Sequence, residues 1–313
     1  MARGSRKSFS SVSPASRFGC AEIRDAALKQ GGVHGYAASP DNLAGARVVG
    51  VWNNVNTQLQ TTEAAVPALF GKTALVTGGS RGIGRASALA LAAAGAQVLV
   101  HYGSAEADAR SVVDAIRQSG GRAQQIRADL RAPDGAHTLA TKVREIIGGR
   151  LDVLVANAGI SKAAALEDTT VEDFDNLAAV NVRAPFFLVQ QLLPIMCKGS
   201  SVIFMSSLVA RSAGAPLSAY AATKGAVEAL MLEFAAALGG KGVRVNAIAP
   251  GVVDTDLSNF TKTDAGRERA LGLQVFKRIA APDDVASAVV FLASDAARWV
   301  SGETLRVDGG SKL

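Results

Sequence analysis

Hydrophobic residues follow two alternating patterns along the chain from residue 72 onward. Short continuous apolar runs are typical of strands buried on both faces, and apolar residues three or four positions apart are typical of helices that cover a core. The runs predict seven strands, at residues 73–77, 97–102, 123–127, 151–156, 201–206, 243–249 and 304–307. The longer stretches predict helices between them, at residues 82–94, 105–119, 133–147, 171–196, 218–238 and 282–294.

Prolines affect the expected geometry of two of the predicted helices. Pro133 is expected in the first turn of its helix, where a missing N–H is tolerated. Pro185 lies inside the helix at 171–196, which is therefore expected to be adjusted near it. The alternation of strands and helices predicts an α/β protein with a doubly wound Rossmann fold, a seven-stranded parallel sheet with helices on both faces. Ligands of such sheets bind beyond the carboxyl ends of the strands.

The sequence pattern changes near residue 70, and no clear hydrophobic periodicity is found before it. We therefore predict an N-terminal extension at residues 1–69, disordered or translated from a misplaced start, and a single Rossmann-fold domain at residues 70–313. The first 20 residues hold four basic residues, six serines and no acid, a composition typical of organelle transit peptides. The last three, Ser311-Lys312-Leu313, match a peroxisomal address. Since the two addresses contradict each other, we expect a cytoplasmic protein, with the peroxisome as the alternative.

Composition and charge narrow the function classes. Hydrophobic residues make up 49% of the chain, enough for a large core, and no uncharged apolar stretch reaches about 18 residues, so no transmembrane helix is predicted. Two cysteines, Cys20 and Cys197, cannot build a disulfide framework, which indicates a reducing compartment. The net charge of +6 is not gathered in a basic run, so nucleic acid is not an expected partner. No metal site is predicted.

Three glycines, spaced G-x-x-x-G-x-G, follow the first predicted strand and precede an alanine-rich helix. Glycines allow a sharp turn, and the backbone N–H groups at a helix N-terminus attract phosphate. The loop therefore predicts a dinucleotide-binding turn, although a tight turn without a ligand is the alternative interpretation. The expected binding residues in this loop are Gly78, Ser80, Arg81, Gly82, Ile83 and Gly84.

Further candidate residues follow the other predicted strands or lie in the two long helices. They are Asn157, Ala158 and Gly159 after the fourth strand, Ser207 after the fifth, Pro250, Gly251, Val253 and Thr255 after the sixth, and Asn181, Tyr220 and Lys224 in the helices. Together with the glycine loop, this set resembles the short-chain dehydrogenase/reductase family over about residues 70–310. The resemblance implies an oxidoreductase that interconverts a carbonyl and an alcohol by hydride transfer. It also implies that the segments at 157–159 and 250–255 contact the cofactor.

Tyr220 and Lys224 lie four residues apart, so they share one face of the predicted helix. An ammonium nearby favours the phenolate, so we expect a lowered tyrosine pKa and a general acid or base at Tyr220. Ser207 is expected to donate a hydrogen bond to the substrate oxygen. The family resemblance implies that Lys224 also binds the ribose and that Asn181 holds a water linking Lys224 to solvent. Ser206 competes with Ser207, and the family's interval of about a dozen residues before the tyrosine favours Ser207.

The end of the second strand indicates which dinucleotide is bound. Enzymes that use NAD commonly place an acid there, and that acid would repel a 2′-phosphate. Here the segment contains His101 and Tyr102, which are expected to contact the cofactor. The first acid is Glu106, expected in the next helix. Arg81 is able to pair with a 2′-phosphate, so NADP(H) is favoured over NAD(H). Asp129, followed by Leu130, matches the family's position near the adenine ring, or is an ordinary cap of the next turn.

Residues 254–279 contain no clear strand and are expected to form a partly helical substrate lid, or else a peripheral hairpin. The substrate is expected to be a small carbonyl or alcohol, carried on an acyl carrier if the protein is a 3-oxoacyl-thioester reductase. Three basic residues, Arg183, Lys198 and Arg211, are candidates for contacting an acidic carrier. By resemblance, two long helices are expected to join copies into a homodimer or homotetramer. A non-catalytic dinucleotide-binding sensor or scaffold is the alternative function.

Overall fold

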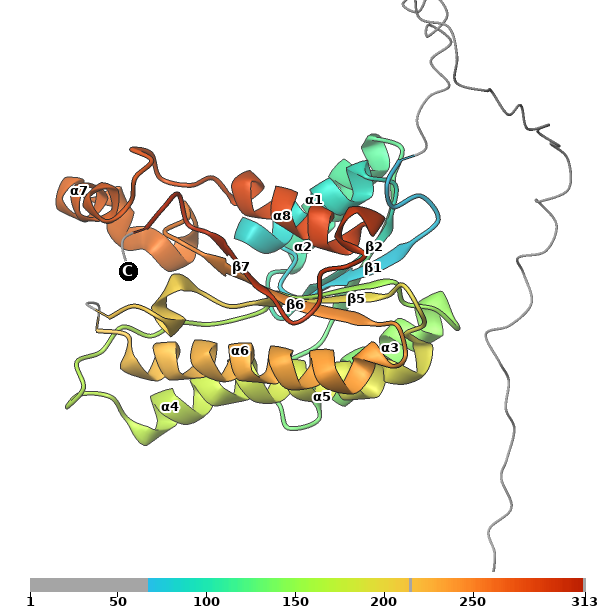
Figure 1. Ribbon diagram of the computed structural model, residues 1–313, viewed down its shortest axis with the longest axis horizontal. Helices are drawn as coiled ribbons and strands as arrows, with labels where there is room; N and C mark the ends of the chain where they lie inside the picture. Colours follow the sequence, from blue (N-terminus) through green and yellow to red (C-terminus); the bar gives the residue numbers. More distant parts are fainter. Residues whose placement is uncertain (1–66, 214–215, 312–313) are drawn as a thin grey trace, which may run out of the picture. The chain divides into compact units, whose positions relative to one another are not determined.

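The computed structural model describes residues 67–213 and 216–311. Its centre is a seven-stranded sheet in the order β3-β2-β1-β4-β5-β6-β7, in which every neighbouring pair is parallel (Figure 1). The strands are β1 (Thr73–Val76), β2 (Gln97–Tyr102), β3 (Arg122–Arg127), β4 (Val153–Ala156), β5 (Ser201–Met205), β6 (Arg244–Pro250) and β7 (Thr304–Val307). The predicted fold, a doubly wound Rossmann sheet of seven parallel strands, is confirmed.

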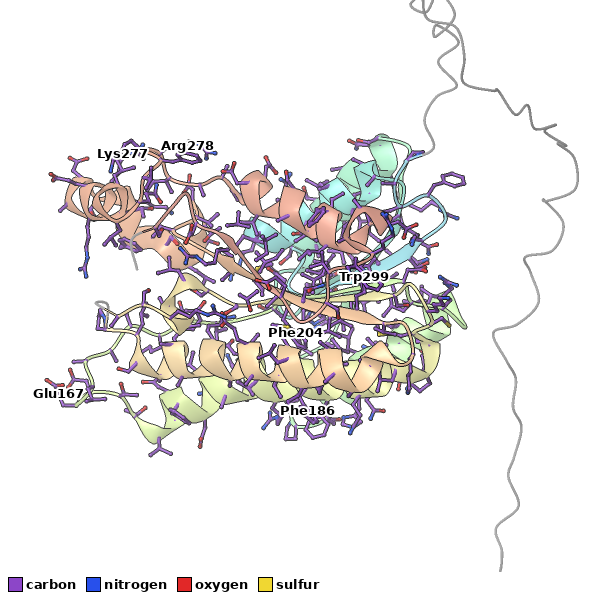
Figure 2. The ribbon with its side chains drawn as sticks, viewed as in Figure 1. Glu167, Phe186, Phe204, Lys277, Arg278 and Trp299 are labelled. Atoms are coloured by element: carbon purple, nitrogen blue, oxygen red, sulfur yellow. The ribbon has the colours of Figure 1, made fainter. Side chains whose placement is uncertain are left out.

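Both faces of the sheet are buried, which explains why its strands read as continuous apolar runs. Successive side chains point to opposite faces, so Leu75 belongs to one core cluster while Ala74 and Val76 belong to the other. Phe204 of β5 is 1% exposed and lies under the sheet, whereas Phe186 lies farther out on a covering helix (Figure 2). Each layer of helices therefore packs on its own hydrophobic cluster.

Six long helical segments cover the two faces (Figure 1). One face carries α1 (Gly82–Ala93), α2 (Glu106–Gln118) and α8 (Pro282–Ala293). The other carries α3 (Gly135–Ile147), α5 (Ala184–Leu192) and α6 (Ser218–Gly239). Among the described helices, none is both long and apolar enough to cross a membrane.

The helix expected at 171–196 is broken into four pieces. They are α4 (Val171–Ala178), a π-helical turn at Ala179–Arg183, α5 and a 3-10 turn at Leu193–Ile195. The wide turn ends at Arg183, two residues before Pro185, whose nitrogen has no hydrogen to donate to the carbonyl of Asn181 four residues earlier. The predicted adjustment near Pro185 is thus a π turn, and Asn181 lies within it.

Two predicted boundaries differ from the structure. Pro133 precedes α3, because a turn closed by the Gly135 N–H and the Ala132 carbonyl (3.1 Å) delays the helix to Gly135. At the other boundary, Leu69 is fully buried and its N–H donates to the Ala94 carbonyl at 2.8 Å. Residues 67–69 of the predicted extension therefore pack on the folded unit, and residues 1–66 lie outside the described residues.

The segment at 254–279 is partly helical, as expected. It contains a 3-10 segment at Asp256–Lys262 and the helix α7 (Asp264–Leu273). Its end is tied to the C-terminal turn, since the Val275 and Phe276 N–H groups both donate to the Gly309 carbonyl, at 3.1 and 3.0 Å. The segment therefore starts after β6, extends away from the sheet and returns to the turn after β7 (Figure 1).

Candidate active site

The turn after β1 brings backbone N–H groups into a cradle at the start of α1. Gly78 and Gly82 adopt φ values of +62° and +54°, a region in which a side chain is strained. A Cβ on Gly84 would lie 2.1 Å from the Gly78 carbonyl oxygen, so the turn closes only without one. The first turn of α1 carries no acidic residue, and its N-cap Arg81 makes no side-chain cap. This backbone geometry fits an anionic phosphate group.

His101 of β2 holds this turn through a hydrogen bond. Its Nδ1 accepts a hydrogen bond from the Gly78 N–H at 3.1 Å, and its Nε2 lies 3.1 Å from the Ala128 carbonyl. One neutral tautomer satisfies both contacts, with the hydrogen on Nε2. Burial lowers the pKa of His101 to about 4, against a smaller opposing effect of the Ala128 hydrogen bond. Both ring nitrogens of His101, which was expected to contact the cofactor, are thus used by backbone groups that follow β1 and β3.

Thr77 and Asn157 join the glycine turn to the end of β4. The Thr77 hydroxyl accepts hydrogen bonds from the N–H groups of Asn157 and Ala158, at 3.0 and 2.9 Å. The Asn157 amide donates to the carbonyls of Thr77 and Gly78, at 2.9 and 3.2 Å. Sequence reasoning missed Thr77, although a hydroxyl residue between an apolar run and a glycine was a usable signal. The three expected residues at 157–159 thus lie beside the glycine turn.

Asn181 holds the segment after Gly159. Its side chain accepts from the Ile160 N–H and donates to the Ile160 carbonyl, both at 2.9 Å. It also donates to the hydroxyl of Thr223 at 3.1 Å, and that hydroxyl donates to the Tyr220 carbonyl at 2.7 Å. The side-chain amide of Asn181 therefore makes its hydrogen bonds with protein groups. These bonds join the π turn to the segment after β4 and to α6. Thr223 is a second residue that the sequence reasoning missed.

Tyr220, Lys224 and Ser207 meet where β5 ends against α6. The Lys224 Nζ lies 5.5 Å from the centre of the Tyr220 ring and donates to the Met205 carbonyl at 2.8 Å. Burial raises the pKa of Tyr220 to about 12, and a hydrogen bond with the Ser207 hydroxyl opposes that rise. Burial also lowers the pKa of Lys224 to about 8. The expected lowering of the tyrosine pKa is therefore wrong, because desolvation outweighs the hydrogen bond with Ser207.

The two candidate serines have different partners. Ser206 is buried, and its hydroxyl donates to the Glu228 carboxylate at 2.9 Å. Ser207 begins a 3-10 turn at Leu208–Ala210, where its Oγ accepts from the Val209 N–H at 3.4 Å. Of the two, Ser207 is the one whose hydroxyl lowers the pKa of Tyr220 against the larger effect of burial. The geometry thus favours Ser207 beside the phenol, in agreement with the interval in the sequence.

The segment after β6 passes over the glycine turn. A Cβ on Gly82 would lie 3.2 Å from the Thr255 methyl group, and one on Gly251 would lie 2.8 Å from the Asp308 Cα. Pro250 ends β6, and Val253 is 3% exposed and pairs in an isolated bridge with Ala280. The residues expected to close over the cofactor therefore lie beside the glycine turn and the C-terminal turn.

The remaining expected cofactor residues lie around the end of β2. Tyr102 is 6% exposed, and its carbonyl accepts from the Ala128 N–H at 3.2 Å. Asp129 is exposed, and its carboxylate accepts from the Arg131 N–H at 2.9 Å, so it closes a local turn. Leu130 is 7% exposed and packs in the core. Arg81 extends from the glycine turn and forms an ion pair with Asp256 at 3.2 Å.

The comparison with known proteins identifies the family. A family model described as enoyl-(acyl carrier protein) reductase matches residues 78–312. The hydroxynaphthalene reductase-like protein Arp2 of Metarhizium robertsii is 38% identical over 267 residues, which cover 81% of this chain and 99% of that protein. The chain belongs to the short-chain dehydrogenase/reductase family. The predicted resemblance is confirmed, and the protein is an oxidoreductase.

Further members of the family are similar over the same region. Versicolorin reductase stcU of Emericella nidulans is 39% identical over 256 residues, covering 78% of this chain and 96% of that protein. The crystal structure of the angucycline C-6 ketoreductase LanV with bound NADP has a TM-score of 0.74 and 41% identity, covering 78% of this chain and 96% of that one. A short-chain dehydrogenase from Burkholderia cenocepacia J2315 in complex with NADP also has a TM-score of 0.74, with 38% identity and coverage of 78% and 98%.

The basic residues proposed to contact an acyl carrier do not gather at this site. Lys198 lies beside Gly242, before β5 and β6, and thus at the opposite edge of the sheet. Arg211 is paired with Glu228 at 2.8 Å, and Arg183 donates to the Arg131 carbonyl. The structure therefore shows no basic patch formed by these three residues.

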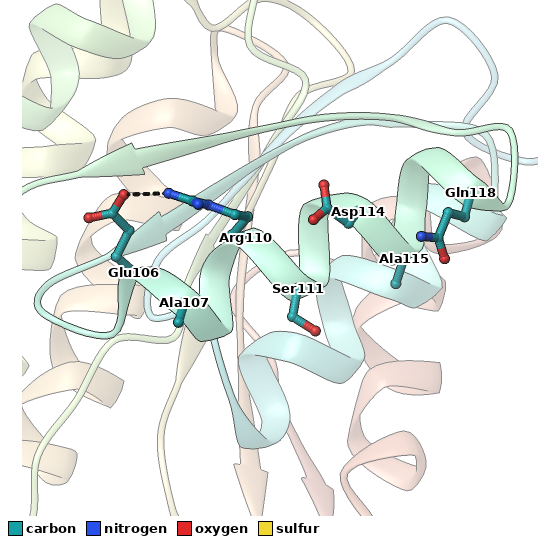
Figure 3. A pocket seen from close by; sticks show the side chains of 7 residues that line it. All are labelled: Glu106, Ala107, Arg110, Ser111, Asp114, Ala115 and Gln118. Atoms are coloured by element: carbon teal, nitrogen blue, oxygen red, sulfur yellow. Dashed lines mark hydrogen bonds and ion pairs between the residues drawn. The ribbon is translucent and has the colours of Figure 1, made fainter.

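A separate hollow runs along the outer face of α2 (Figure 3). Its described lining residues are Glu106, Ala107, Arg110, Ser111, Asp114, Ala115 and Gln118. An exposed ion pair between Arg110 and Glu106, at 3.0 Å, crosses one end of it. Because these residues belong to a single helix face, the hollow is separate from the candidate active site.

Proposed function

We propose that the protein is an NADP(H)-dependent reductase that converts a ketone of a fused aromatic compound into an alcohol, with Tyr220 as the proton donor. The observation that carries this proposal is the meeting of Tyr220, Ser207 and Lys224 beside the glycine turn. Burial raises the pKa of Tyr220 to about 12, so the phenol holds its proton at neutral pH. A protonated phenol is the form that a carbonyl reduction requires.

The cofactor is NADP(H). The solved structures of LanV and of the Burkholderia cenocepacia enzyme contain NADP, and the end of β2 offers no acid to repel a 2′-phosphate. The backbone of the glycine turn is expected to hold the diphosphate, and Arg81 the 2′-phosphate. When bound, such a dinucleotide supplies a hydride for the carbonyl carbon. The residues at 157–159 and 250–255 are proposed to complete its binding site.

The protein's own groups are proposed to act on the substrate oxygen. Tyr220 donates its phenolic proton to that oxygen, and Ser207 donates a hydrogen bond that stabilises the developing negative charge. Lys224 lies 5.5 Å from the phenol ring, so its positive charge stabilises the phenolate that remains. Asn181 holds the Ile160 segment and, through Thr223, the helix that carries Tyr220.

The exposed side chains of the expected lid, residues 254–279, favour an apolar substrate. Five large apolar side chains on it are exposed: Leu257, Phe260, Leu273, Val275 and Phe276. Such a surface suits a fused ring system. One relative carries hydroxynaphthalene in its name, which is a fused aromatic compound. A 3-oxoacyl thioester is the second candidate, because the matching family model is described as an enoyl-(acyl carrier protein) reductase, whose substrate is also an acyl thioester.

A substrate panel separates the two candidates. NADPH consumption is measured with 2-tetralone and related bicyclic ketones, and with an acetoacetyl thioester. We expect kcat/KM to be at least about tenfold higher for the ketones, a difference of about 1.4 kcal/mol in transition-state binding. A preference for the thioester would replace the aromatic assignment. Turnover of neither class, with NADPH still bound, would favour a non-catalytic sensor.

We further propose that α4, α5 and α6 join copies into a homodimer or homotetramer. Val171 and Phe174 on α4 and Leu232 on α6 are exposed apolar residues, which suit burial against another copy. The mass in solution, measured by light scattering, tests this. A cytoplasmic location is also proposed, and imaging of the tagged full chain distinguishes it from the peroxisome.

A further inference from the structure

Three successive turns of α6 present chemically active residues on one face: Tyr220, Lys224 and then Glu228. The first two belong to the proposed mechanism, and the third does not. Glu228 is 8% exposed, so its carboxylate is largely removed from water. A buried carboxylate requires hydrogen-bond partners, because burying an unpaired charge is costly. An apolar residue would fill the same space without that requirement.

The partners of Glu228 lie on both sides of Ser207. One carboxylate oxygen accepts from the Ser206 hydroxyl at 2.9 Å, and the other accepts from the Arg211 Nε at 2.8 Å. Between these two contacts runs the 3-10 turn at Leu208–Ala210, which Ser207 begins. A single side chain of α6 therefore holds both ends of the turn that carries the proposed oxyanion donor.

The surroundings of this turn include a buried polar group without a partner. A small hollow adjoins the turn, and its lining includes Ser207, Leu208, Arg211, Glu228 and Thr304. The Thr304 hydroxyl is buried and has no hydrogen-bond partner among the described residues. The hydrogen bonds of Glu228 with Ser206 and Arg211 connect the Ser207 segment to α6.

We propose that Glu228 is a positioning residue that sets the Ser207 hydroxyl at hydrogen-bonding distance from Tyr220. It does not touch the substrate, and it acts through Ser206 and Arg211. Tyr220 and Glu228 lie on the same rigid helix, so holding the Ser207 turn on Glu228 also fixes its distance from the phenol. This inference rests on the proposed reductase function.

The test is a double-mutant cycle with Glu228→Gln and Ser207→Ala, using NADPH and 2-tetralone or the most active ketone of the panel. Glutamine keeps the shape but has no charge and only one accepting oxygen, so it cannot accept from both Ser206 and Arg211 as the carboxylate does. We expect Glu228→Gln to lower kcat about tenfold or more in the natural chain and less than about twofold in the Ser207→Ala background, because residues that act through each other are not additive. Its Kd for NADPH is expected to stay unchanged.

Two further variants make the test specific. Glu233→Gln removes an exposed carboxylate from the same helix and is expected to leave kcat unchanged. Ser206→Ala removes one partner only, and it is expected to reproduce part of the loss. If Glu228→Gln lowers kcat by the same factor with and without Ser207, or changes only the melting temperature, the positioning role is wrong.

The proposed function fails separately, through Tyr220. If Tyr220→Phe retains turnover, the reductase mechanism itself is wrong, whatever Glu228→Gln does. If Tyr220→Phe and Ser207→Ala both lose activity while Glu228→Gln remains fully active, only the inference about Glu228 is overturned.

Discussion

The Lys224 ammonium lies 5.5 Å from the centre of the Tyr220 ring, yet its hydrogen bond goes to the Met205 carbonyl at 2.8 Å. Its charge therefore acts on the phenol through space. In this geometry, burial has the larger effect and raises the pKa of Tyr220 to about 12. The pair is thus arranged to keep a proton on Tyr220 until a substrate oxygen takes it, which is the arrangement needed for reduction.

Replacing Tyr220 by phenylalanine is expected to remove the proton donor and little else. Loss of general acid catalysis lowers kcat by about 10²–10⁴-fold. NADPH binding should change little, because the glycine turn and Asn157 are untouched. Steady-state kinetics and a fluorescence titration with NADPH measure the two effects. Activity within a few-fold of the natural chain would contradict the role of Tyr220.

Ketone reduction is expected to slow as the pH rises through about 8. Burial lowers the pKa of Lys224 to about 8, so above that pH the amine is neutral and no longer stabilises the phenolate formed at Tyr220. Below it the ammonium is charged and the rate is level. A profile of kcat against pH measures this, and Lys224→Arg is the matched variant, since arginine keeps its charge and should abolish the fall. A rate that increases through pH 8 would contradict the assignment.

The sequence was sufficient to predict the fold, because strands that are buried on both faces consist of continuous apolar runs. It was also sufficient to predict that Ser207, Tyr220 and Lys224 lie near one another, since their spacing depends on one turn and one helix. The hydrogen-bond partners of buried polar groups were harder to predict from the sequence. His101 lies near the carboxyl end of β2, where cofactors bind, but its Nδ1 accepts from the Gly78 N–H 23 residues away. Only the paired register of β1 and β2 brings those groups together.

The sign of the tyrosine pKa shift was also beyond the sequence. The interval between Tyr220 and Lys224 gives the proximity of a charge, whereas desolvation depends on everything that packs around the phenol. Thr77 and Thr223 were missed for a similar reason. The Thr77 hydroxyl accepts from the Asn157 N–H 80 residues away, and the Thr223 hydroxyl accepts from the Asn181 side chain 42 residues away, so a local pattern identifies the partner of neither.

Arg81 is expected to determine the preference for NADPH over NADH. It pairs with Asp256 at 3.2 Å, and both side chains are largely exposed, so this ion pair contributes at most about 1 kcal/mol. Arg81→Ala should raise the Kd for NADPH about tenfold, a loss of about 1.4 kcal/mol, and leave the Kd for NADH unchanged. Asp256→Asn should lower the Kd for NADPH about two- to fivefold by releasing Arg81. Titration calorimetry measures all four constants.

The exposed pair of Arg110 and Glu106 on α2 provides the control for this prediction. Its length, 3.0 Å, and its exposure are similar, but it belongs to the separate hollow along that helix. Glu106→Gln should leave both dinucleotide constants unchanged. Equal losses of NADPH and NADH affinity in Arg81→Ala would show that Arg81 supports the turn rather than the 2′-phosphate.

His101 is expected to make the protein sensitive to acid. The native imidazole stays neutral down to a pKa of about 4, whereas in the unfolded chain it takes up a proton near the ordinary value of 6.5. Protons therefore favour the unfolded chain, and stability that is fully present above pH 6.5 is lost as the pH falls toward 4. At pH 5 the loss attributable to this group is about 2 kcal/mol relative to pH 7.5.

Urea denaturation at pH 7.5 and pH 5 measures this loss. His101→Gln should be less stable than the natural chain at pH 7.5, because the contacts with Gly78 and Ala128 are disturbed, but its stability should depend less on pH. His137→Gln is the matched control, since His137 is exposed. If the natural chain and the His101→Gln variant lose the same free energy of unfolding between pH 7.5 and pH 5, His101 is not the group responsible for the acid sensitivity. Because His101 supports Gly78, NADPH affinity in the natural chain should weaken over the same interval of pH.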